Sequence, residues 1–356
     1  MKIGNSNGTV FAISAIVMSA FASPTLAAGH FISGLQSMYP AYDLDDAYVF
    51  QSSTEGYTSF ILSSNPSTPG SNKPPAGVVF GQGGLYNLHI AGDEKFKTGM
   101  TLAFSFLGED ITVSKLTSPN SPIGEKGNPI GQGKVGAAFE ITGGIRIWAG
   151  RGNDPFFGNG IGLADFNDSR QRGQFKPDAF KEGGDLFANA TASFIVADIP
   201  NSMLGDKVKY FTTTATMHKG EWRQVDRLAN VLFPYVFLAD TPAVQEDHQQ
   251  HRPDLDVEER RQAVVNNTFW AVSVSGSQKG REMEYAQTVA DLVMPDVITY
   301  TIGSKANYVV DELNGRPLQD DAMNTVLQLM NGVAIDDFAN DGKRYREEFP
   351  YISPAK

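Results

Sequence analysis

Short β-rich segments recur through the first two thirds of the chain, and they restrict its fold more than any other feature. In residues 85–90 and 100–106 apolar and polar residues alternate, which is typical of strands with one buried face. Further segments predicted to be strands span residues 57–62, 138–148, 192–199 and 208–217. Turns are frequent between them, since the 356 residues include 36 glycines and 19 prolines. We therefore expect a mainly β fold with antiparallel sheets in a sandwich or a barrel-like arrangement.

The sequence changes character towards its C-terminus. Residues 242–290 are polar and helix-prone, and residues 319–330 place Ala322, Val326, Leu329 and Met330 on one face of an amphipathic helix. By contrast, residues 117–134 are rich in turn formers and are predicted to be a long surface loop. Helices are thus expected in the C-terminal third. No long low-complexity linker marks a boundary, so residues 29–356 are predicted to form a single mainly β domain with C-terminal helical elements.

The first 28 residues are typical of a secretory signal peptide. Lys2 supplies a positive start, residues 10–22 are apolar, and residues 23–28 combine a proline with small residues of the kind that signal peptidase recognises. The apolar stretch is shorter than the roughly 20 residues of a membrane-spanning helix. We expect cleavage near Ala27 or Ala28, no transmembrane segment in the mature chain, and a periplasmic or secreted bacterial protein.

Charge and cysteine content exclude several function classes. The formal net charge of -11 repels phosphate backbones and anionic lipids, which argues against nucleic acid as a partner. The chain has no cysteine, so disulfides, thiol nucleophiles and cysteine-ligated metal sites are impossible. An exported domain of this size without disulfide bonds fits a bacterial better than a eukaryotic source.

Four segments spread over the chain resemble an exported bacterial family known as domain of unknown function 4331 (DUF4331). They are residues 43–50 (DLDDAYVF), 148–157 (WAGRGNDPFF), 224–230 (QVDRLAN) and 313–321 (LNGRPLQDD), and a closing FPY follows at 349–351. The first is similar to the family's D-x-x-D-x-Y-x-F and the second to its A-G-x-R-x-D-P-F-F, with Arg151 one position earlier. His30 occupies the place of a histidine that is frequent in the family. The resemblance implies an exported protein of a single, mainly β architecture and supplies no activity.

Arginine and aspartate recur together in three of these segments. Arg151 and Asp154 are three residues apart in a turn before a proline, and we expect them to pair across it. Asp226 with Arg227, and Arg316 with Asp320 and Asp321, repeat the combination. Two interpretations stay open. In the first, an anion- or ligand-binding cleft is bordered by Arg151, Asp154, Asp226, Arg227 and Arg316. In the second, these residues hold buried loops together, and Asp320 or Asp321 stabilises the start of the following helix.

Clusters of carboxylates are candidate cation sites. Asp43, Asp45 and Asp46 form the densest cluster, and Asp165, Asn167 and Asp168 form another. Hard cations such as Ca²⁺ bind several converging oxygens, which makes Ca²⁺ a possible cofactor. Strict alternation would place Asp43 and Asp45 on one side of an extended segment and Asp46 on the other. The histidines His248 and His251 lie in a highly polar segment that we expect to be solvated.

Three functions compete at this point. The leading hypothesis is an exported, non-enzymatic binding or structural protein that holds a small ligand, a glycan or a cation, because no standard nucleophile or metal triad is evident. The alternative is an extracytoplasmic hydrolase or lyase in which Asp154 and Asp226 act as acid and base and Arg151 stabilises negative charge. A third hypothesis, assembly into a surface layer or complex, rests on export and the β-rich pattern alone.

Overall fold

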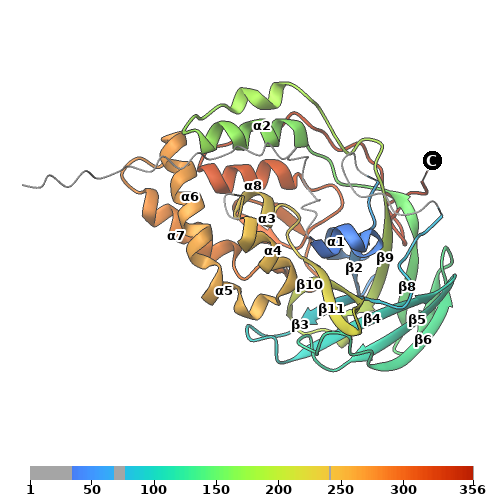
Figure 1. Cartoon of the computed structure of the whole chain (residues 1–356). Coiled ribbons are helices and arrows are strands. Elements are labelled where there is room, and N and C mark those ends of the chain that lie inside the picture. Colours follow the sequence, from blue (N-terminus) through green and yellow to red (C-terminus); the bar gives the residue numbers. More distant parts are fainter. Residues whose placement is uncertain (1–33, 68–76, 240–241, 356) are drawn as a thin grey trace, which may run out of the picture.

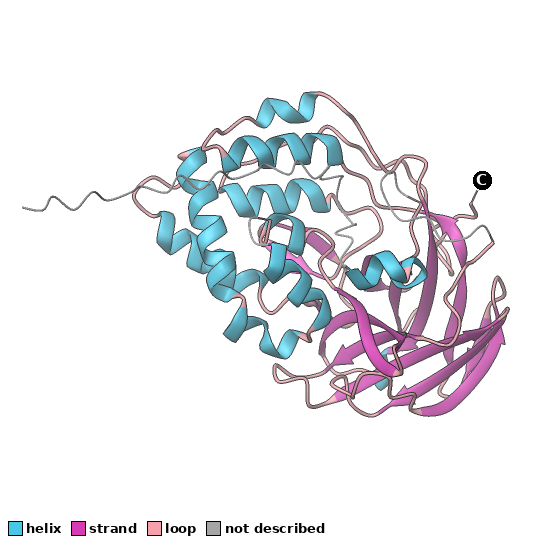
Figure 2. Cartoon of the chain, in the orientation of Figure 1, coloured by secondary structure: helices cyan, strands magenta, loops and turns pink. Residues whose placement is uncertain are grey.

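The computed structural model describes residues 34–67, 77–239 and 242–355. The predicted signal peptide and His30 lie outside these residues. Within them, fourteen strands form three antiparallel sheets, and most of the eight α-helices gather on one side, while α1 lies beside the strands (Figures 1 and 2). The predicted mainly β class, with most helices towards the C-terminus, is confirmed.

The two large sheets share one hydrophobic core. The five-stranded sheet has the order β1 (Leu44–Gln51), β2 (Tyr57–Ser64), β9 (Thr191–Pro200), β8 (Ile145–Asn153) and β7 (Phe139–Ile141). The larger sheet has the order β11 (Glu221–Leu228), β10 (Lys207–His218), β3 (Leu85–Ala91), β4 (Gly99–Leu107), β5 (Asp110–Leu116) and β6 (Asn128–Lys134), and β12 (Ile298–Thr301) also pairs with β10. β13 (Asn307–Val309) and β14 (Glu312–Asn314) form a separate hairpin. The inward side chains of both large sheets, such as Phe60, Ile195, Leu102 and Tyr210, fill the common core.

The edges of these two sheets approach each other on both sides, which gives the barrel-like character. On one side, the backbone N–H of Leu44, at the start of β1, donates to Oδ2 of Asp226 in β11 at 2.8 Å. On the other, β6 passes so close to β7 that a Cβ added to Gly131 would lie 2.1 Å from Cγ2 of Ile141. Only glycine permits this approach.

Most of the helices form a second core beside the sheets, whereas Leu35 of the first helix packs in the core of the sheets. The helices are α1 (Gly34–Met38), α2 (Gly160–Gln171), α3 (Phe233–Val236), α4 (Pro242–Gln250), α5 (Asp256–Glu259), α6 (Arg261–Ser275), α7 (Glu282–Val293) and α8 (Ala322–Asn331), with short 3₁₀ helices at Pro40–Tyr42, Pro177–Lys181, Asn201–Met203 and Pro253–Leu255. Residues of α2, α3, α6, α7 and α8 share this core. Asp321 caps α8 by accepting from the N–H of Asn324 at 3.0 Å, as expected for an aspartate at that position. Among the described residues, none of the helices combines the length and apolar character needed to cross a bilayer.

The structure differs from the sequence prediction in several segments. Residues 138–148, predicted as one strand, are divided by a turn at residues 142–144 into β7 and the start of β8. Residues 128–134 form the edge strand β6 inside the segment predicted to be a loop, because an edge strand pairs through its backbone and needs little apolar alternation. α2 was not predicted, since it begins with two glycines in its first three residues. Its N-terminus is fixed by Asn159, whose side chain accepts from the N–H of Gly162.

Replacing Gly131 with alanine is expected to destabilise the protein by about 1–3 kcal/mol, because the new methyl group would overlap Ile141 at the β6–β7 edge. Urea unfolding followed by circular dichroism measures this change. Gly205→Ala is the control, since a Cβ there meets nothing closer than 4.0 Å. Equal stability of the two variants would contradict the close approach of the sheet edges.

Candidate functional site

The structure buries nearly all the candidate site residues. Arg151 is partly exposed, and the others are at most 2% exposed: Asp43, Asp45, Asp46, Asp154, Asp226, Arg227 and Arg316. An open cleft bordered by these residues is therefore absent from the described part of the chain. Their charges must instead be balanced inside the protein, because an isolated buried charge is costly.

Asp45, Asp46 and Asp154 form the most concentrated carboxylate cluster, here called the triaspartate centre. One oxygen from each carboxylate lies within 4.8 Å of the other two, and all three residues are buried. The predicted separation of Asp45 and Asp46 onto opposite faces is wrong. The pairing of β1 with β2 is interrupted by an irregularity between Leu44 and Ala47, and a bulge of this kind breaks strict alternation.

Asp154 reaches the centre from the turn between β8 and α2. Its Oδ1 accepts from the N–H of Phe156 at 3.0 Å, and its own N–H donates to the carbonyl of Ala190 at 3.0 Å. Nε of Arg344 donates to the carbonyl of Asp154 at 2.8 Å, while Phe156 and Phe157 are buried as expected. The Asp154 carboxylate is therefore held in one position by its own turn.

Arg316 supplies the cation that the centre contacts directly. Its Nη1 donates to Oδ1 of Asp46 at 2.7 Å, and its Nε and Nη2 donate to the two oxygens of Asp320 at 2.8 and 3.1 Å. Backbone hydrogen bonds between Arg316 and Val49 join the same segment to β1. One buried guanidinium thus serves two carboxylates, and neither Asp45 nor Asp154 is paired with it.

Burial and mutual repulsion raise the pKa values of this centre. Burial, followed by the charges of Asp154 and Asp46, raises the pKa of Asp45 well above its ordinary value. Burial raises the pKa of Asp46 to about 7 despite the opposing effect of Arg316, and it raises the pKa of Asp154 to about 6. When Asp45 and Asp154 are both ionised, Oδ2 of Asp154 has no hydrogen-bond donor among the described residues. A proton on the Asp45 carboxyl would supply this donor.

Tyr48 adds an unsatisfied polar group beside the centre. It follows Asp46 by two residues on β1, its ring lies under the Arg316 guanidinium with 4.7 Å from the ring centroid to Cζ, and it is fully buried. Its hydroxyl has no hydrogen-bond partner among the residues that the structure describes. After burial, the charge of Asp46 contributes most to raising the pKa of Tyr48, which indicates that the two groups are close.

Asp43 is directed to a second acidic pair. Burial and then the charge of Asp43 raise the pKa of Asp226, while the N–H groups of Leu44 and Arg227 and the side chain of Gln36 oppose that increase. The charge of Asp43 also raises the pKa of Asp45, while Asp154 completes the denser group with Asp45 and Asp46. Sequence spacing gave no signal for this, because Asp154 is more than a hundred residues from β1.

The predicted pair between Arg151 and Asp154 does not form. Arg151 donates to the carbonyl of Thr191 at 3.0 Å, to the hydroxyls of Thr191 and Ser193, and to the carbonyl of Asn65. Arg151 lies within β8, whereas Asp154 follows the strand, so the neighbouring strand β9 supplies the partners. Its charge still acts on Asp45 over a longer distance.

Arg227 belongs to a separate buried network with a histidine. Its guanidinium donates to both oxygens of Asp256 at 3.0 and 2.5 Å, and Nε2 of His248 lies 3.0 Å from Oδ2 of Asp296. The expectation that His248 is solvated is wrong, since it is fully buried, although His251 is exposed. Burial and the charge of Arg227 lower the pKa of His248, which favours its neutral form at pH 7. Asp256 and Asp296, which lie outside α4, bind Arg227 and His248, and these contacts allow the polar His248 side chain to be buried.

The second predicted acidic cluster lies on α2. Asp165 and Asp168 are exposed on this helix, and Asp168 pairs with Arg172 there. Exposed acidic residues on one helix do not require a cation, so this cluster is an ordinary solvated surface.

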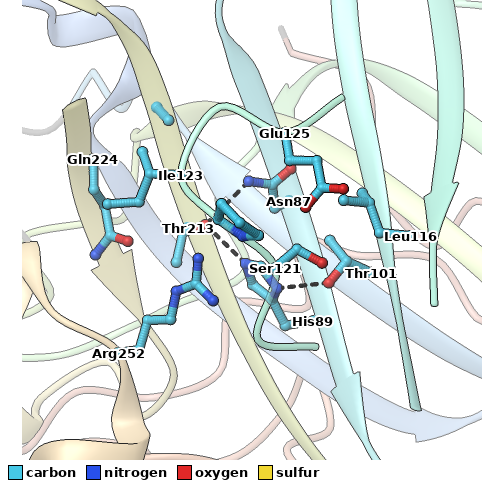
Figure 3. A pocket seen from close by; sticks show the side chains of 12 residues that line it. Asn87, His89, Thr101, Leu116, Ser121, Ile123, Glu125, Thr213, Gln224 and Arg252 are labelled. Carbon is cyan, nitrogen blue, oxygen red and sulfur yellow. Dashed lines mark hydrogen bonds between the residues drawn. The ribbon is translucent and has the colours of Figure 1, made fainter. Parts of the chain in front are cut away.

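His89 lies at a small polar cavity, where Thr101 and Thr213 contact its two ring nitrogens at 2.8 Å (Figure 3). Thr101 donates its own proton to the carbonyl of Ser118, so Nδ1 of His89 is the donor in its contact with Thr101. Burial and the nearby charge of Arg252 lower the pKa of His89 to about 3. The cavity volume of about 10 Å³ has room for one water molecule, so this histidine is a structural group of the sheet.

Comparisons of the chain with protein-family models, with curated proteins and with solved structures found no match. The resemblance of its four segments to the DUF4331 family therefore stays a prediction. Three of those segments nevertheless meet in space, since Asp46, Asp154 and Arg316 each come from a different one.

Replacing Arg316 with methionine is expected to destabilise the protein by about 3–5 kcal/mol, because Asp46 and Asp320 would lose their buried counter-charge. Urea unfolding measures the change. Arg172→Met is the matched control, since the side chains of Arg172 and Asp168 are 57% and 59% exposed and such a pair contributes at most about 1 kcal/mol. A loss at Arg316 no larger than at Arg172 would contradict a central role for the buried guanidinium.

The acidic centre of the cation-free protein is expected to contribute less stability as the pH rises from about 4 to about 7. A carboxyl whose pKa is raised in the folded state keeps its proton there after the unfolded chain has lost it, so the contribution is complete below the ordinary pKa of 3.8 and falls until the raised pKa, about 7 for Asp46. The lowered pKa values of the buried histidines have the opposite effect over part of this range, so the wild type is compared with Asp45→Asn. In chelator, the unfolding free energy of the wild type should fall by about 1–3 kcal/mol relative to that of the variant over this range. A difference that does not change with pH would show that the centre is not its source.

Proposed function

We propose that this chain is an exported, non-enzymatic bacterial binding protein whose triaspartate centre holds a divalent cation of the Ca²⁺ type. The observation that carries the proposal is the convergence of three buried carboxylates within 4.8 Å. Arg316 is shared by Asp46 and Asp320, and Oδ2 of Asp154 has no hydrogen-bond partner among the described residues, so this oxygen is available to a cation.

A hard cation fits the donor set. Ca²⁺ binds carboxylate and carbonyl oxygens at 2.3–2.6 Å in flexible geometries, so oxygens on opposite sides of the ion are about 5 Å apart. The 4.8 Å limit within the centre agrees with this separation. The unpartnered hydroxyl of Tyr48 is a further oxygen beside the centre, independent of the carboxylates. Oδ2 of Asp154 is similarly available to a metal ion.

The cation would act as a structural cross-link. Asp45 and Asp46 come from β1, Asp154 from the turn before α2, and Arg316 from the segment between β14 and α8. Binding would therefore join the five-stranded sheet to the start of the helical layer. Because ligands that bind only the folded state stabilise it, the cation would contribute directly to folding.

Catalysis by these residues has less support. A hydrolase or lyase that used Asp154 and Asp226 would need a substrate to reach carboxylates that are 0% and 2% exposed. Export and family membership enter the proposal from the signal-like N-terminus and the four DUF4331-like segments. Neither a glycan nor a nucleic acid has a binding surface among the residues of this centre.

The purified protein, treated with chelator and then dialysed against Ca²⁺, is expected to bind one ion per chain. Saturation at about 100 times the dissociation constant should add about 2.7 kcal/mol to the unfolding free energy. Elemental mass spectrometry measures the stoichiometry, and thermal unfolding measures the stabilisation. Asp45→Asn and Asp154→Asn should abolish both effects, and Tyr48→Phe should weaken binding.

The asparagine variants distinguish a cation site from a purely structural cluster. Removing one of three repelling charges should leave the cation-free protein as stable as the wild type or more stable, while Ca²⁺ no longer stabilises it. Asp165→Asn, on the exposed face of α2, is the matched control and should bind Ca²⁺ normally. The proposal is wrong if millimolar Ca²⁺ neither binds nor stabilises the wild-type protein.

A further inference from the structure

A cavity of about 230 Å³ lies where the helical layer meets the larger sheet. The helices α3, α7 and α8 contribute to its wall together with β10, β12 and the β13–β14 hairpin, and Figure 1 shows these helices gathered on one side of the sheets. None of its lining residues belongs to the triaspartate centre. The cavity is therefore independent of the proposed cation site.

Most of the side chains that line this cavity are apolar. They include the buried Phe233, Phe237, Val326 and Leu329. Of the polar residues that line it, two bind each other, since the hydroxyl of Tyr308 donates to Oδ1 of Asn230 at 3.0 Å. The amide nitrogen of Asn230 donates to Asp296 at 2.8 Å. Its interior thus favours an apolar ligand.

The mouth of the cavity carries a positive charge. Lys207, at the start of β10, lines the cavity and is exposed, and its ammonium group has no ion pair or hydrogen bond with the residues that the structure describes. Lys209, two residues further along the same strand, instead pairs with Glu94 at 3.0 Å. Leu292 also lines the cavity and is 48% exposed, so an apolar surface extends from the interior to the solvent.

We infer that this cavity binds a small amphiphilic carboxylate, with its hydrocarbon part between α3, α7 and α8 and its carboxylate at Lys207. The volume supports a hydrocarbon larger than benzene, since an engineered apolar cavity of about 150 Å³ accommodates benzene. The hydroxyl of Thr299, which also lines the cavity, is a second polar group for the carboxylate. An apolar interior with one cation at its opening selects an anionic amphiphile over a neutral or cationic one.

Isothermal titration calorimetry with octanoate tests the inference on the full mature chain in buffer with fixed Ca²⁺. Binding of one octanoate per chain is expected, with affinity rising about fourfold for each methylene from butanoate to octanoate. Octan-1-ol and octyltrimethylammonium should bind at least about tenfold more weakly than octanoate. These comparisons measure the apolar and the charged part of the site separately.

Lys207→Met should weaken octanoate binding about tenfold and leave the affinity for octan-1-ol unchanged. Lys209→Met is the matched control on the same strand and should bind octanoate as the wild type does, because Lys209 does not line the cavity. Val326→Phe should reduce the binding of both octanoate and octan-1-ol by filling the interior. Since Lys207 is exposed, its variant is expected to fold even if the Val326 variant does not.

The inference is overturned if millimolar octanoate does not bind the wild-type protein. It is also overturned if octanoate and octyltrimethylammonium bind equally, or if Lys207→Met and Lys209→Met have the same effect. Loss of Ca²⁺ binding in Asp154→Asn would leave these results unchanged, because the two sites share no residue. The cation and carboxylate proposals can therefore fail independently.

Discussion

The guanidinium of Arg316 is the contact on which the arrangement of the buried charges depends. It binds Asp46 on β1 and Asp320 before α8, and its backbone pairs with Val49 of the same strand. A buried arginine with two carboxylates is stable only if its geometry is good and its hydrogen bonds are satisfied. Because the same group is shared by Asp46 and Asp320, its single positive charge does not balance all the carboxylates gathered around it. The acidic character of the triaspartate centre therefore follows from how the C-terminal segment is attached to the sheet.

The elements with regular periodicity could be predicted from sequence, and the irregular positions could not. Residues 85–90 and 100–106 alternate cleanly, and β3 and β4 contain them. The irregular pairing near Asp45 depends on how β1 aligns with β2, a non-local property that alternation within one segment cannot reveal. The helix α2 was recognisable only from its cap at Asn159, because its apolar residues do not form a clear stripe.

Partner choice for charged side chains was the least predictable part of the site. Arg151 and Asp154 are close in sequence, yet Arg151 binds groups of the neighbouring strand β9 while Asp154 faces β1. His248 lies in a polar helix, yet Arg227, Asp256 and Asp296 from other segments allow it to be buried. In both cases the decisive neighbours are distant in sequence. Residue type correctly indicated where charge is concentrated, and the fold decided which charges meet.

One segment of the chain reaches both proposed sites. The segment from β12 to α8 passes the cavity at Tyr308 and Leu313 and then reaches the triaspartate centre at Arg316, three residues beyond Leu313. The ring of Tyr308 also lies near the Arg316 guanidinium, with 5.5 Å between its centroid and Cζ. The β13–β14 hairpin thus lines the cavity directly and meets the triaspartate centre only through Arg316. A substitution of Asp154 leaves that lining in place, because the cavity and the centre share no residue.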